Sequence, residues 1–421
     1  MMKILNIKKI KLDKPESYYD ISVDKYNNFI INNSIVVHNC FYHHGSTSIE
    51  NAIITMAQKF KNNIPFLEED GQFGSLRSTQ AGASRYIGTK LSDSFRKIYK
   101  DFDLLEYRYE EGEKIEPYYF LPIIPTILLN GTTGIAVGFA STIMGRNIID
   151  IADSCILYLK SNKASNVDPY IEVFNGSIKV DPENHKRWII QGKYERINSS
   201  TIQIKELPIS MTYERYEEIL DKLVEDKIII SYEDKCRDSI NYFVKMSKNS
   251  LEVMSDKEII KIFKLEEQVT ENFSTLDEKG KLRLFENTAE IIEYFVKFRL
   301  KFYKKRKDKQ LSNLEYELKV LSNKYKFIKL ILDGVIIINN IEKKIIIQSI
   351  KENNLEMIDG SYEYLLRLPI YSLTKENNES LLMGINTTNK EIDDIKNTDP
   401  KDIYIKDLNE LKKYFKNNVV K

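Results

Sequence analysis

A long helical pattern toward the C-terminal end is the feature that most constrains the fold. From about Asn287 the apolar residues keep a helical period for more than forty residues. Within it a row of apolar residues steps by 3, 4, 3, 4 and 3, which is the spacing of a coiled-coil seam: Leu311, Leu314, Leu318, Leu321, Tyr325 and Ile328. Gly334 ends the predicted helix. We expect residues 402–416 to return as the second helix of a long antiparallel coiled coil.

The rest of the chain predicts an α+β multidomain protein. Its 421 residues exceed the roughly 250 to 300 that one core usually supports. Residues 1–39 alternate short apolar runs with turn residues, a pattern typical of small β-strands. Residues 47–62 predict a helix, a glycine-containing loop at 68–75 follows, and a second helix is expected near Ser78, as in a winged-helix unit. Between Trp188 and Met246, strands surround an amphipathic helix.

Composition narrows the function only by exclusion. The 63 basic and 62 acidic side chains leave a net charge of +1, so a nucleic-acid surface requires local clustering, as in residues 297–309 with eight basic residues. Cys40, Cys155 and Cys236 are too few and too scattered for a disulfide framework or a zinc site, which fits a reducing, cytoplasmic compartment. No apolar run is long enough for a membrane helix. No glycine-rich phosphate loop or acidic cluster indicates an ATP or metal site.

The residues His38, Asn39 and Cys40 permit peptide-bond cleavage. An asparagine amide can attack its own carbonyl carbon, a neighbouring histidine can protonate the leaving amine, and the cysteine can first capture an acyl chain as a thioester. The segment YDISVDKYNNFIINNSIVVHNC resembles the C-terminal splicing blocks of inteins. That resemblance implies a split-intein half at residues 1–39, with Cys40 as the first retained residue. The other reading is a small β-rich domain in which these residues have no such role.

Several blocks after Cys40 resemble type IIA DNA topoisomerases. They are YHHGSTSIENAIITMAQ, LEEDGQFGS, AGASRYIGTKLS, EPYYFLPIIPTILLNGTTGIAVGFAS, IKELPIS and DEKGKLRLFENTAEIIEYFVKFR. YHHG and ASRYI favour the medium subunit of T-even phages over the cleavage subunit of bacterial gyrase. The resemblance implies four parts: residues 1–39 as the intein fragment, 40–145 as a winged-helix cleavage domain that lacks its start, 146–286 as an α/β tower, and 287–421 as a coiled coil with a helical dimer gate.

The resemblance also implies catalytic residues. Tyr86 is the expected nucleophile, which joins DNA through a transient 5′-phosphotyrosine link. A phenol suits this task because it can attack a phosphodiester and later leave again, although its ordinary pKa near 10 calls for positive surroundings or a base. Arg85 is expected to stabilise charge on the phosphoryl oxygens. Either His43 or His44 fits the assisting position, and we choose His44, directly before Gly45.

Further residues are expected to bind DNA. Ile135 aligns with the apolar wedge that the family pushes between base pairs to bend the duplex. Arg77, Lys90 and Arg146 are expected to contact DNA, with Arg146 reaching a phosphate directly. For each residue, and for the basic stretch at 297–309, packing or a solvated helix face is the alternative.

The resemblance assigns the remaining functions to partners. A separate large subunit is expected to bind both ATP and Mg²⁺, and a fusion to the other intein half is expected to supply the missing start of the protein. Double-stranded DNA, a homodimer and the cytoplasm of a phage-infected bacterium complete the expectation, with no membrane. Together these features predict the breakage-and-rejoining subunit of an ATP-dependent type II topoisomerase. One alternative is a coiled-coil architectural protein that binds DNA without cleaving it, and another treats splicing as the principal activity.

Overall fold

The computed structural model describes residues 46–418, apart from 111, 137, 138 and 238, and also the backbone of four short strands nearer the N-terminus. These strands form two antiparallel pairs, β1 with β2 and β3 with β4. Their bounds are Asn6–Lys11, Ser17–Ser22, Asn28–Ile31 and Ile35–His38. Short strands therefore do form where alternating apolar residues predicted them. Asn39, Cys40, His43 and His44 lie outside the described residues.

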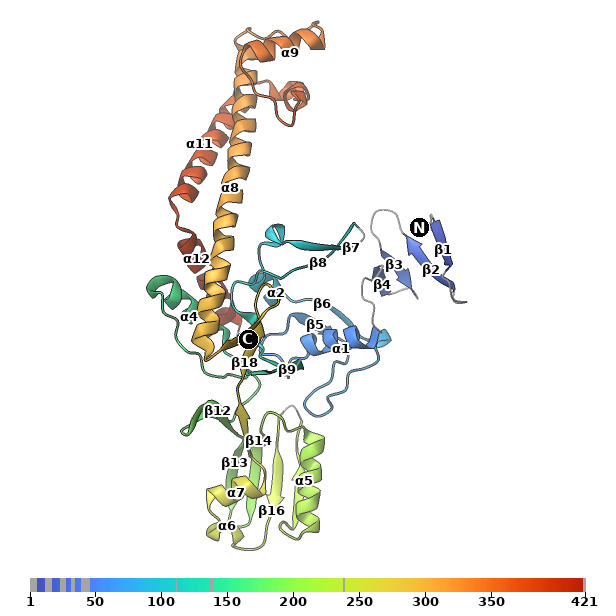
Figure 1. The fold of residues 1–421 in the computed structure, drawn as a ribbon, viewed down its shortest axis with the longest axis vertical. Helices are drawn as coiled ribbons and strands as arrows, with labels where there is room; N and C mark the ends of the chain where they lie inside the picture. Colours follow the sequence, from blue (N-terminus) through green and yellow to red (C-terminus); the bar gives the residue numbers. More distant parts are fainter. Residues whose placement is uncertain are drawn as a thin grey trace.

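A central domain carries most of the elements that follow (Figure 1). Its elements are α1 (Ser46–Ala57), β5 (Leu67–Asp70), η1 (Ser84–Tyr86), β6 (Gly88–Leu91), α2 (Asp93–Ile98), η2 (Phe102–Leu104), β7 (Tyr107–Glu110), β8 (Glu113–Pro117), α3 (Thr126–Leu129), β9 (Thr132–Ala136), β10 (Phe139–Ile143) and α4 (Ile148–Ser161). The strands pair as three antiparallel hairpins, β5 with β6, β7 with β8 and β9 with β10. Side chains of α3 and α4 are buried together in the central core.

The second helix expected near Ser78 is absent from the described residues, and that prediction is wrong. Residues 78–83 form an irregular loop, followed by the short 3-10 turn η1 and, later, by α2. Backbone hydrogen bonds from Ser75 N to Ser78 O and from Gly82 N to Gln72 O, both 2.8 Å long, close this loop on itself. These bonds use backbone groups that a helix would need for its own ladder.

A second domain, which we call the tower (residues 177–270), extends away from the central domain. A three-stranded sheet has the order β11 (Ser177–Asp181), β12 (Asn184–Gln191), β17 (Glu266–Thr270). A four-stranded sheet has the order β13 (Lys193–Asn198), β14 (Thr201–Glu206), β16 (Tyr242–Lys245), β15 (Ser231–Asp234). The helices are α5 (Tyr213–Glu225), α6 (Ser250–Val253) and α7 (Asp256–Ile262). This domain has its own hydrophobic core.

The expected domain boundary after residue 145 falls inside a core. Ile151, Ala152 and Cys155 of α4 are completely buried in the central core, together with Val167 beyond the helix. Residues 146–167 therefore pack as part of the central domain, and the tower begins later in the chain. After the tower, the hairpin of β18 (Phe273–Leu276) and β19 (Leu282–Phe285) returns the chain to the central domain.

The long predicted helix is present as α8, which spans Thr288–Leu332 and has 45 residues. At 1.5 Å per residue it is about 68 Å long. Beyond it lie α9 (Lys343–Glu352), α10 (Glu363–Leu366) and η3 (Ile370–Ser372), and the chain returns through α11 (Lys375–Asn397) and α12 (Pro400–Asn418). We call α8 to α11 the arm; it projects from the central domain, and a small core lies at its far end (Figure 1).

The partner of α8 differs from the expected one. Helix α11, not residues 402–416, runs antiparallel to α8, because Glu315 pairs with Lys396 while Leu321 lies beside Gly384. Residues 402–416 belong to α12, which packs against α4 and the base of α8. Their spaced apolar side chains, Tyr404, Leu408, Leu411 and Phe415, are buried in the central core.

Buried charges join the arm to the central domain. Arg306 donates from Nε and Nη2 to Asp101 at 2.5 and 2.6 Å, and from Nη1 to Asp407 at 2.7 Å. Arg299, with no exposed surface, also pairs with Asp101. Asp407 further accepts hydrogen bonds from Lys100 (2.9 Å) and from the hydroxyl of Tyr303 (2.8 Å).

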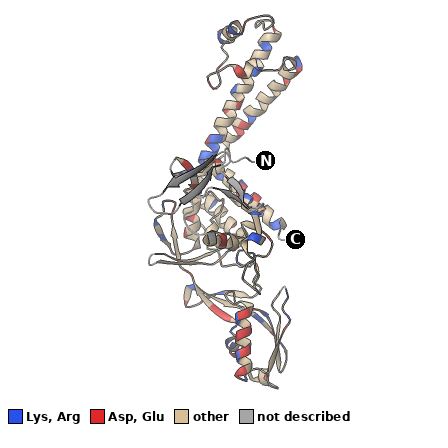
Figure 2. Ribbon diagram, turned by 90° about the vertical axis from the view of Figure 1, so that its right-hand side faces the viewer, with Lys and Arg blue, Asp and Glu red and all other residues tan. Residues whose placement is uncertain are grey.

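This network corrects our reading of residues 297–309 as a DNA surface. Arg299 and Arg306 are committed to Asp101, Lys305 pairs with Glu106, and Lys309 pairs with Asp103. Figure 2 shows the basic residues gathered where the arm leaves the central domain, while acidic residues follow α5 of the tower. Most of the positive charge of the stretch is therefore neutralised inside the molecule and holds the arm in place.

Asp407 makes this joint sensitive to acid. Burial disfavours its charged form, but hydrogen bonds from Arg306 and Lys100 and the charges of both outweigh burial and hold the pKa of Asp407 below its ordinary value. A depressed pKa in the folded state stabilises the fold above the unfolded pKa of about 3.9. This contribution is lost as the pH falls through the lower folded-state value.

We predict that Asp407→Asn lowers the free energy of unfolding by about 3 kcal/mol at neutral pH, because Arg306 and Lys100 remain buried without their carboxylate. The measurement is denaturant unfolding at pH 7 and again below pH 4, where the difference from the wild type should shrink. Glu315→Gln, which breaks the half-exposed pair with Lys396 (3.3 Å), is the matched control and should cost less than about 1 kcal/mol. Equal losses in the two variants would contradict the assignment.

Candidate active site

Tyr86 lies at the surface, on the loop that joins β5 to β6. Asp70 is the register partner of Gly88 in this hairpin, so the loop begins and ends at one place. The turn η1 closes with a hydrogen bond from the Tyr86 nitrogen to the Ala83 oxygen (2.8 Å), and the Tyr86 side chain is 75% exposed. A phenol at the outer end of a short turn is open to a large substrate.

Close backbone packing behind Tyr86 holds the loop. Gly71 has a φ of +102°, and a Cβ there would lie 3.1 Å from the Tyr86 oxygen and 3.2 Å from Cγ2 of Ile87. A side chain at residue 71 would therefore be strained by its backbone conformation and would also push against the tyrosine segment. The sequence pattern predicted a glycine-containing loop but gave no sign that Gly71 supports Tyr86.

Contacts from α1 and from the tower hold the same loop. The buried Gln58, just beyond α1, donates from Nε2 to the Phe73 oxygen at 2.7 Å. Leu76 packs against the tower core, and Arg77 donates to the Cys236 oxygen (3.1 Å) and to Asp234 (3.0 Å). The loop thus connects the central domain to the tower.

The structure places some of the predicted residues beside Tyr86. The Arg85 guanidinium carbon lies 5.3 Å from the centre of the Tyr86 ring, and the Arg85 side chain is exposed. Lys90 is on β6 of the same hairpin and pairs with Glu68 at 3.0 Å, with a hydrogen bond and the charge of Glu68 raising the pKa of Lys90. Arg77 ties the loop to the tower, and its contact with DNA stays a prediction.

Arg146 is not at the surface, and its expected contact with a phosphate is corrected. The side chain is 1% exposed. Its guanidinium pairs bidentately with Glu271, Nη1 with Oε1 and Nη2 with Oε2, both at 2.6 Å, and Nε donates to the Val167 oxygen at 3.2 Å. Glu271 is 125 residues away along the chain, so no local pattern could have revealed this partner.

Ile135 has the opposite environment. It is 86% exposed near the turn of the β9–β10 hairpin, where it is the register partner of Ala140. A branched apolar side chain in water at the tip of a hairpin is costly to leave uncovered unless another surface meets it. The exposure of Ile135 is the geometry that an intercalating wedge requires.

The remaining predicted site residues cannot be compared with the structure. His43, His44, Asn39 and Cys40 lie outside the described residues, and His38 ends β4, of which only the backbone is described. Among the residues that the structure describes, no group of three or more His, Cys, Asp or Glu side chains is arranged to hold a metal ion. Over the same residues, no helix is both long and apolar enough to cross a bilayer.

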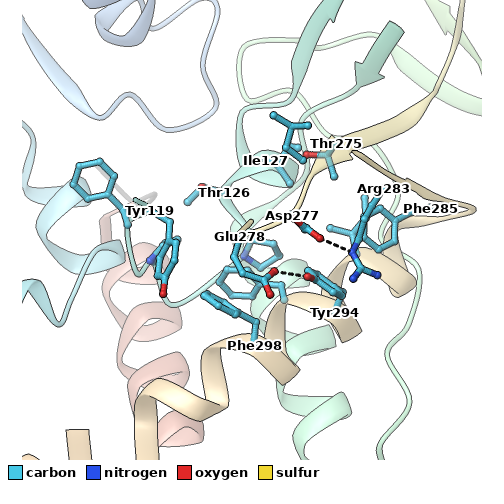
Figure 3. Close-up of a pocket in the computed structure, with 16 residues that line it drawn as sticks. Tyr119, Thr126, Ile127, Thr275, Asp277, Glu278, Arg283, Phe285, Tyr294 and Phe298 are labelled. Atoms are coloured by element: carbon cyan, nitrogen blue, oxygen red, sulfur yellow. Dashed lines mark hydrogen bonds and ion pairs between the residues drawn. The ribbon is translucent and has the colours of Figure 1, made fainter. Parts of the chain in front are cut away.

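Two cavities distinguish the tyrosine region from the rest of the central domain. One, of about 480 Å³, lies between α1 and residues 79–84 of the Tyr86 loop, with Glu50, Thr55, Lys61 and Ser84 on its walls. The other, of about 270 Å³, is lined by aromatic side chains of α8 and of the segment before α3, and by the β18–β19 hairpin (Figure 3). In it Glu278 accepts a hydrogen bond from Tyr294, and Asp277 pairs with Arg283. No residue of the Tyr86 loop lines this second cavity.

Comparison with known proteins gives a consistent assignment. The family model for the gyrase A protein and its topoisomerase IV counterpart (DNA gyrase/topoisomerase IV) matches residues 32–409. DNA topoisomerase 2 of Plasmodium falciparum (isolate K1 / Thailand) is 34% identical over 422 aligned positions, which cover 90% of this chain and 30% of that protein. The DNA topoisomerase medium subunit of Enterobacteria phage T4 is 31% identical over 380 positions, which cover 88% of this chain and 84% of that protein.

A solved structure has the same fold. The crystal structure of the Plasmodium falciparum topoisomerase II DNA-binding, cleavage and re-ligation domain superposes with a TM-score of 0.78 at 34% identity, over 90% of this chain and 56% of that one. The chain thus spans about a third of the length of the first relatives and most of the phage subunit. From the family model, the relatives and the shared fold, we conclude that the chain belongs to the family of DNA gyrase and topoisomerase IV A-type subunits.

Proposed function

We propose that this chain is the breakage-and-rejoining subunit of a type II DNA topoisomerase, with Tyr86 as its nucleophile. The phenol oxygen attacks a DNA phosphorus atom, a bond from that oxygen to phosphorus forms, and the bond from phosphorus to the 3′ oxygen breaks. The strand is left with a 5′-phosphotyrosine end and a free 3′-hydroxyl, and the reverse step reseals it. The supporting observation is that Tyr86 is 75% exposed on a loop held by tight backbone contacts.

The neighbours of Tyr86 supply charge. Arg85, 5.3 Å from the ring, is close enough to pair with the phosphoryl oxygens as negative charge develops on them. Lys90, on the same hairpin, adds positive charge for the flanking backbone. We assign removal of the phenol proton to His44 or His43. ATP and Mg²⁺ belong to a separate large subunit in this proposal, and the metal stabilises the leaving oxygen when it is bound.

Ile135 bends the duplex in this proposal. Its exposed side chain enters between two base pairs, and the kinked DNA then contacts more of the protein. Specificity follows from how easily a sequence deforms, and weak sequence preference is expected. Passage of a second duplex through a double-strand break requires two tyrosines, so the active form is a two-fold homodimer. We place it in the cytoplasm of a phage-infected bacterium.

We predict that Tyr86→Phe abolishes covalent attachment to DNA, because phenylalanine has no oxygen to bond to phosphorus. The chain is mixed with a type II large subunit, Mg²⁺ and end-labelled plasmid, denatured with detergent, and analysed for protein-linked linear DNA. Tyr109→Phe, at a tyrosine that is 69% exposed on β7, is the matched control and should retain the adduct. An adduct with Tyr86→Phe would contradict the assignment. Binding and bending without any wild-type adduct would favour the architectural alternative.

We predict that a second copy of the chain covers the far end of the arm. Ile370 is 86% exposed, Tyr371 82% and Met383 70%, an apolar surface typical of an interface. Ile370→Asp should raise the dimer dissociation constant by at least tenfold, since a buried carboxylate without a partner is costly. Sedimentation measures the constant. Val253→Asp, at an 87% exposed residue of the tower, is the control. Unchanged dimerisation of Ile370→Asp would exclude this surface.

We further propose that residues 1–39 act as the C-terminal half of a split intein. Strand β4 pairs with β3 and ends at His38, directly before the predicted cleavage point. Cys40 would accept the upstream chain as a thioester, and the Asn39 side-chain nitrogen would then attack the Asn39 carbonyl carbon. The peptide bond to Cys40 breaks, a succinimide forms, and the freed amine of Cys40 captures the acyl chain.

We predict that Asn39→Ala blocks release of the N-terminal fragment. The chain is incubated with a polypeptide that ends in an N-terminal intein half, and mass spectrometry follows a fragment that ends at residue 39. Asn33→Ala, in the same segment, should release the fragment as the wild type does. Equal release from Asn39→Ala would show that another residue breaks the bond, and uncleaved wild type with every such partner would favour an ordinary β-rich domain.

A further inference from the structure

The hairpin that carries Ile135 is free at its tip and fixed at its base. Residues 132–135 are exposed. At the other end of β10, Thr142 forms two backbone hydrogen bonds with Asn272, of 3.0 and 2.8 Å, and the Met144 nitrogen donates to Oε1 of Glu271 at 2.8 Å. Both partners lie between β17 and β18, on the chain that returns from the tower. The base of the hairpin is therefore held by residues that follow the tower.

Glu271 is the centre of this attachment. Its two oxygens accept hydrogen bonds from the Met144 nitrogen, from both terminal nitrogens of Arg146 (2.6 Å each), and from Nε1 of Trp188 on β12 (2.9 Å). The Glu271 residue is 3% exposed. Arg146 in turn donates to the oxygens of Met144 and Val167. One carboxylate thus ties the wedge hairpin, the central domain and the tower sheet together.

Such a joint resists bending. A buried arginine paired bidentately with a carboxylate loses much stabilisation if either partner is withdrawn, because water does not replace the lost bonds. Every nitrogen of the Arg146 guanidinium has an acceptor, so one arrangement of the joint is strongly favoured. An apolar wedge must push against stacked base pairs, and only a rigid support turns this push into a bend in the duplex.

We propose that Glu271 is a positioning residue for DNA bending, which acts through Arg146 and Met144 to hold the Ile135 hairpin rigidly on the tower. This inference rests on the proposed role of Ile135. Glu271 does not touch the DNA. Its loss is expected to weaken bending more than it weakens binding, and a duplex that bends easily should rescue the defect.

The test uses the full chain and two kinds of variant. Glu271→Gln removes the charge with little change of shape but leaves Arg146 unpaired, and this variant can fail to fold. The double variant Arg146→Met with Glu271→Met replaces the pair by apolar side chains of similar volume, a change that proteins often tolerate well. Glu286→Gln, which breaks the exposed pair with Lys186 (2.7 Å), is the control.

Two measurements accompany each variant. Trp188 is the one tryptophan in the chain, so its fluorescence reports directly on the joint. Bending is followed by energy transfer between dyes at the ends of a short duplex. Affinity is compared for an intact duplex and for the same duplex with an unpaired bulge at its centre. For the double variant we expect altered Trp188 emission, reduced bending, and an increase of about tenfold in the preference for the bulged duplex. Glu286→Gln should match the wild type.

The outcomes separate the two proposals. Altered Trp188 emission with wild-type bending and wild-type preference would overturn the role of Glu271. An equal loss of affinity for both duplexes would overturn it too, because it would indicate a general defect in binding. If Ile135→Ala bends DNA as well as the wild type does, or if the wild type does not bend it, the wedge proposal fails regardless of Glu271. Reduced bending in both Ile135→Ala and the double variant supports both.

Discussion

The desolvated pair between Arg146 and Glu271 sets the relation between the two largest parts of the chain. The central domain and the tower have separate hydrophobic cores, so shared apolar surface does not fix the angle between them. The buried pair, with Trp188 and the Met144 nitrogen, joins them at the base of the Ile135 hairpin. The Tyr86 loop adds a second connection through Arg77 and Asp234. Nucleophile and wedge therefore both depend on how the tower is seated.

Much of the fold follows from periodicity, and what periodicity misses has a physical reason. The seam that includes Leu314 and Leu318 predicted α8 correctly, because its spacing is set by the helix itself. The same pattern does not say what covers the seam. Tyr404 and Leu408 of α12 have seam-like spacing and cover the central core, whereas the polar helix α11 covers α8. Which amphipathic face meets which core is decided by packing between segments far apart in sequence.

The site shows a similar division. Tyr86 and Arg85 are recognisable from a short motif, and the structure sets them together at the surface. Arg146 was misjudged because an arginine is expected at the surface, and the carboxylate that buries it lies 125 residues away. The basic stretch at 297–309 was misjudged for the same reason, since Asp101 and Asp407 neutralise it from other elements. Composition reveals a cluster of charge, but only the fold reveals its partners.

The dimensions of the arm turn small motions at its base into large ones at its end. Helix α8 has 45 residues and is held near its start by Arg299 and Arg306. With a length of about 68 Å, a tilt of about 5° about this pivot displaces the far end by about 6 Å. Angular amplification of this kind lets sub-ångström adjustments around Asp101 and Asp407 become side-chain-sized separations at the distant helices. The rigidity of one long helix thus converts electrostatics at the pivot into travel at the tip.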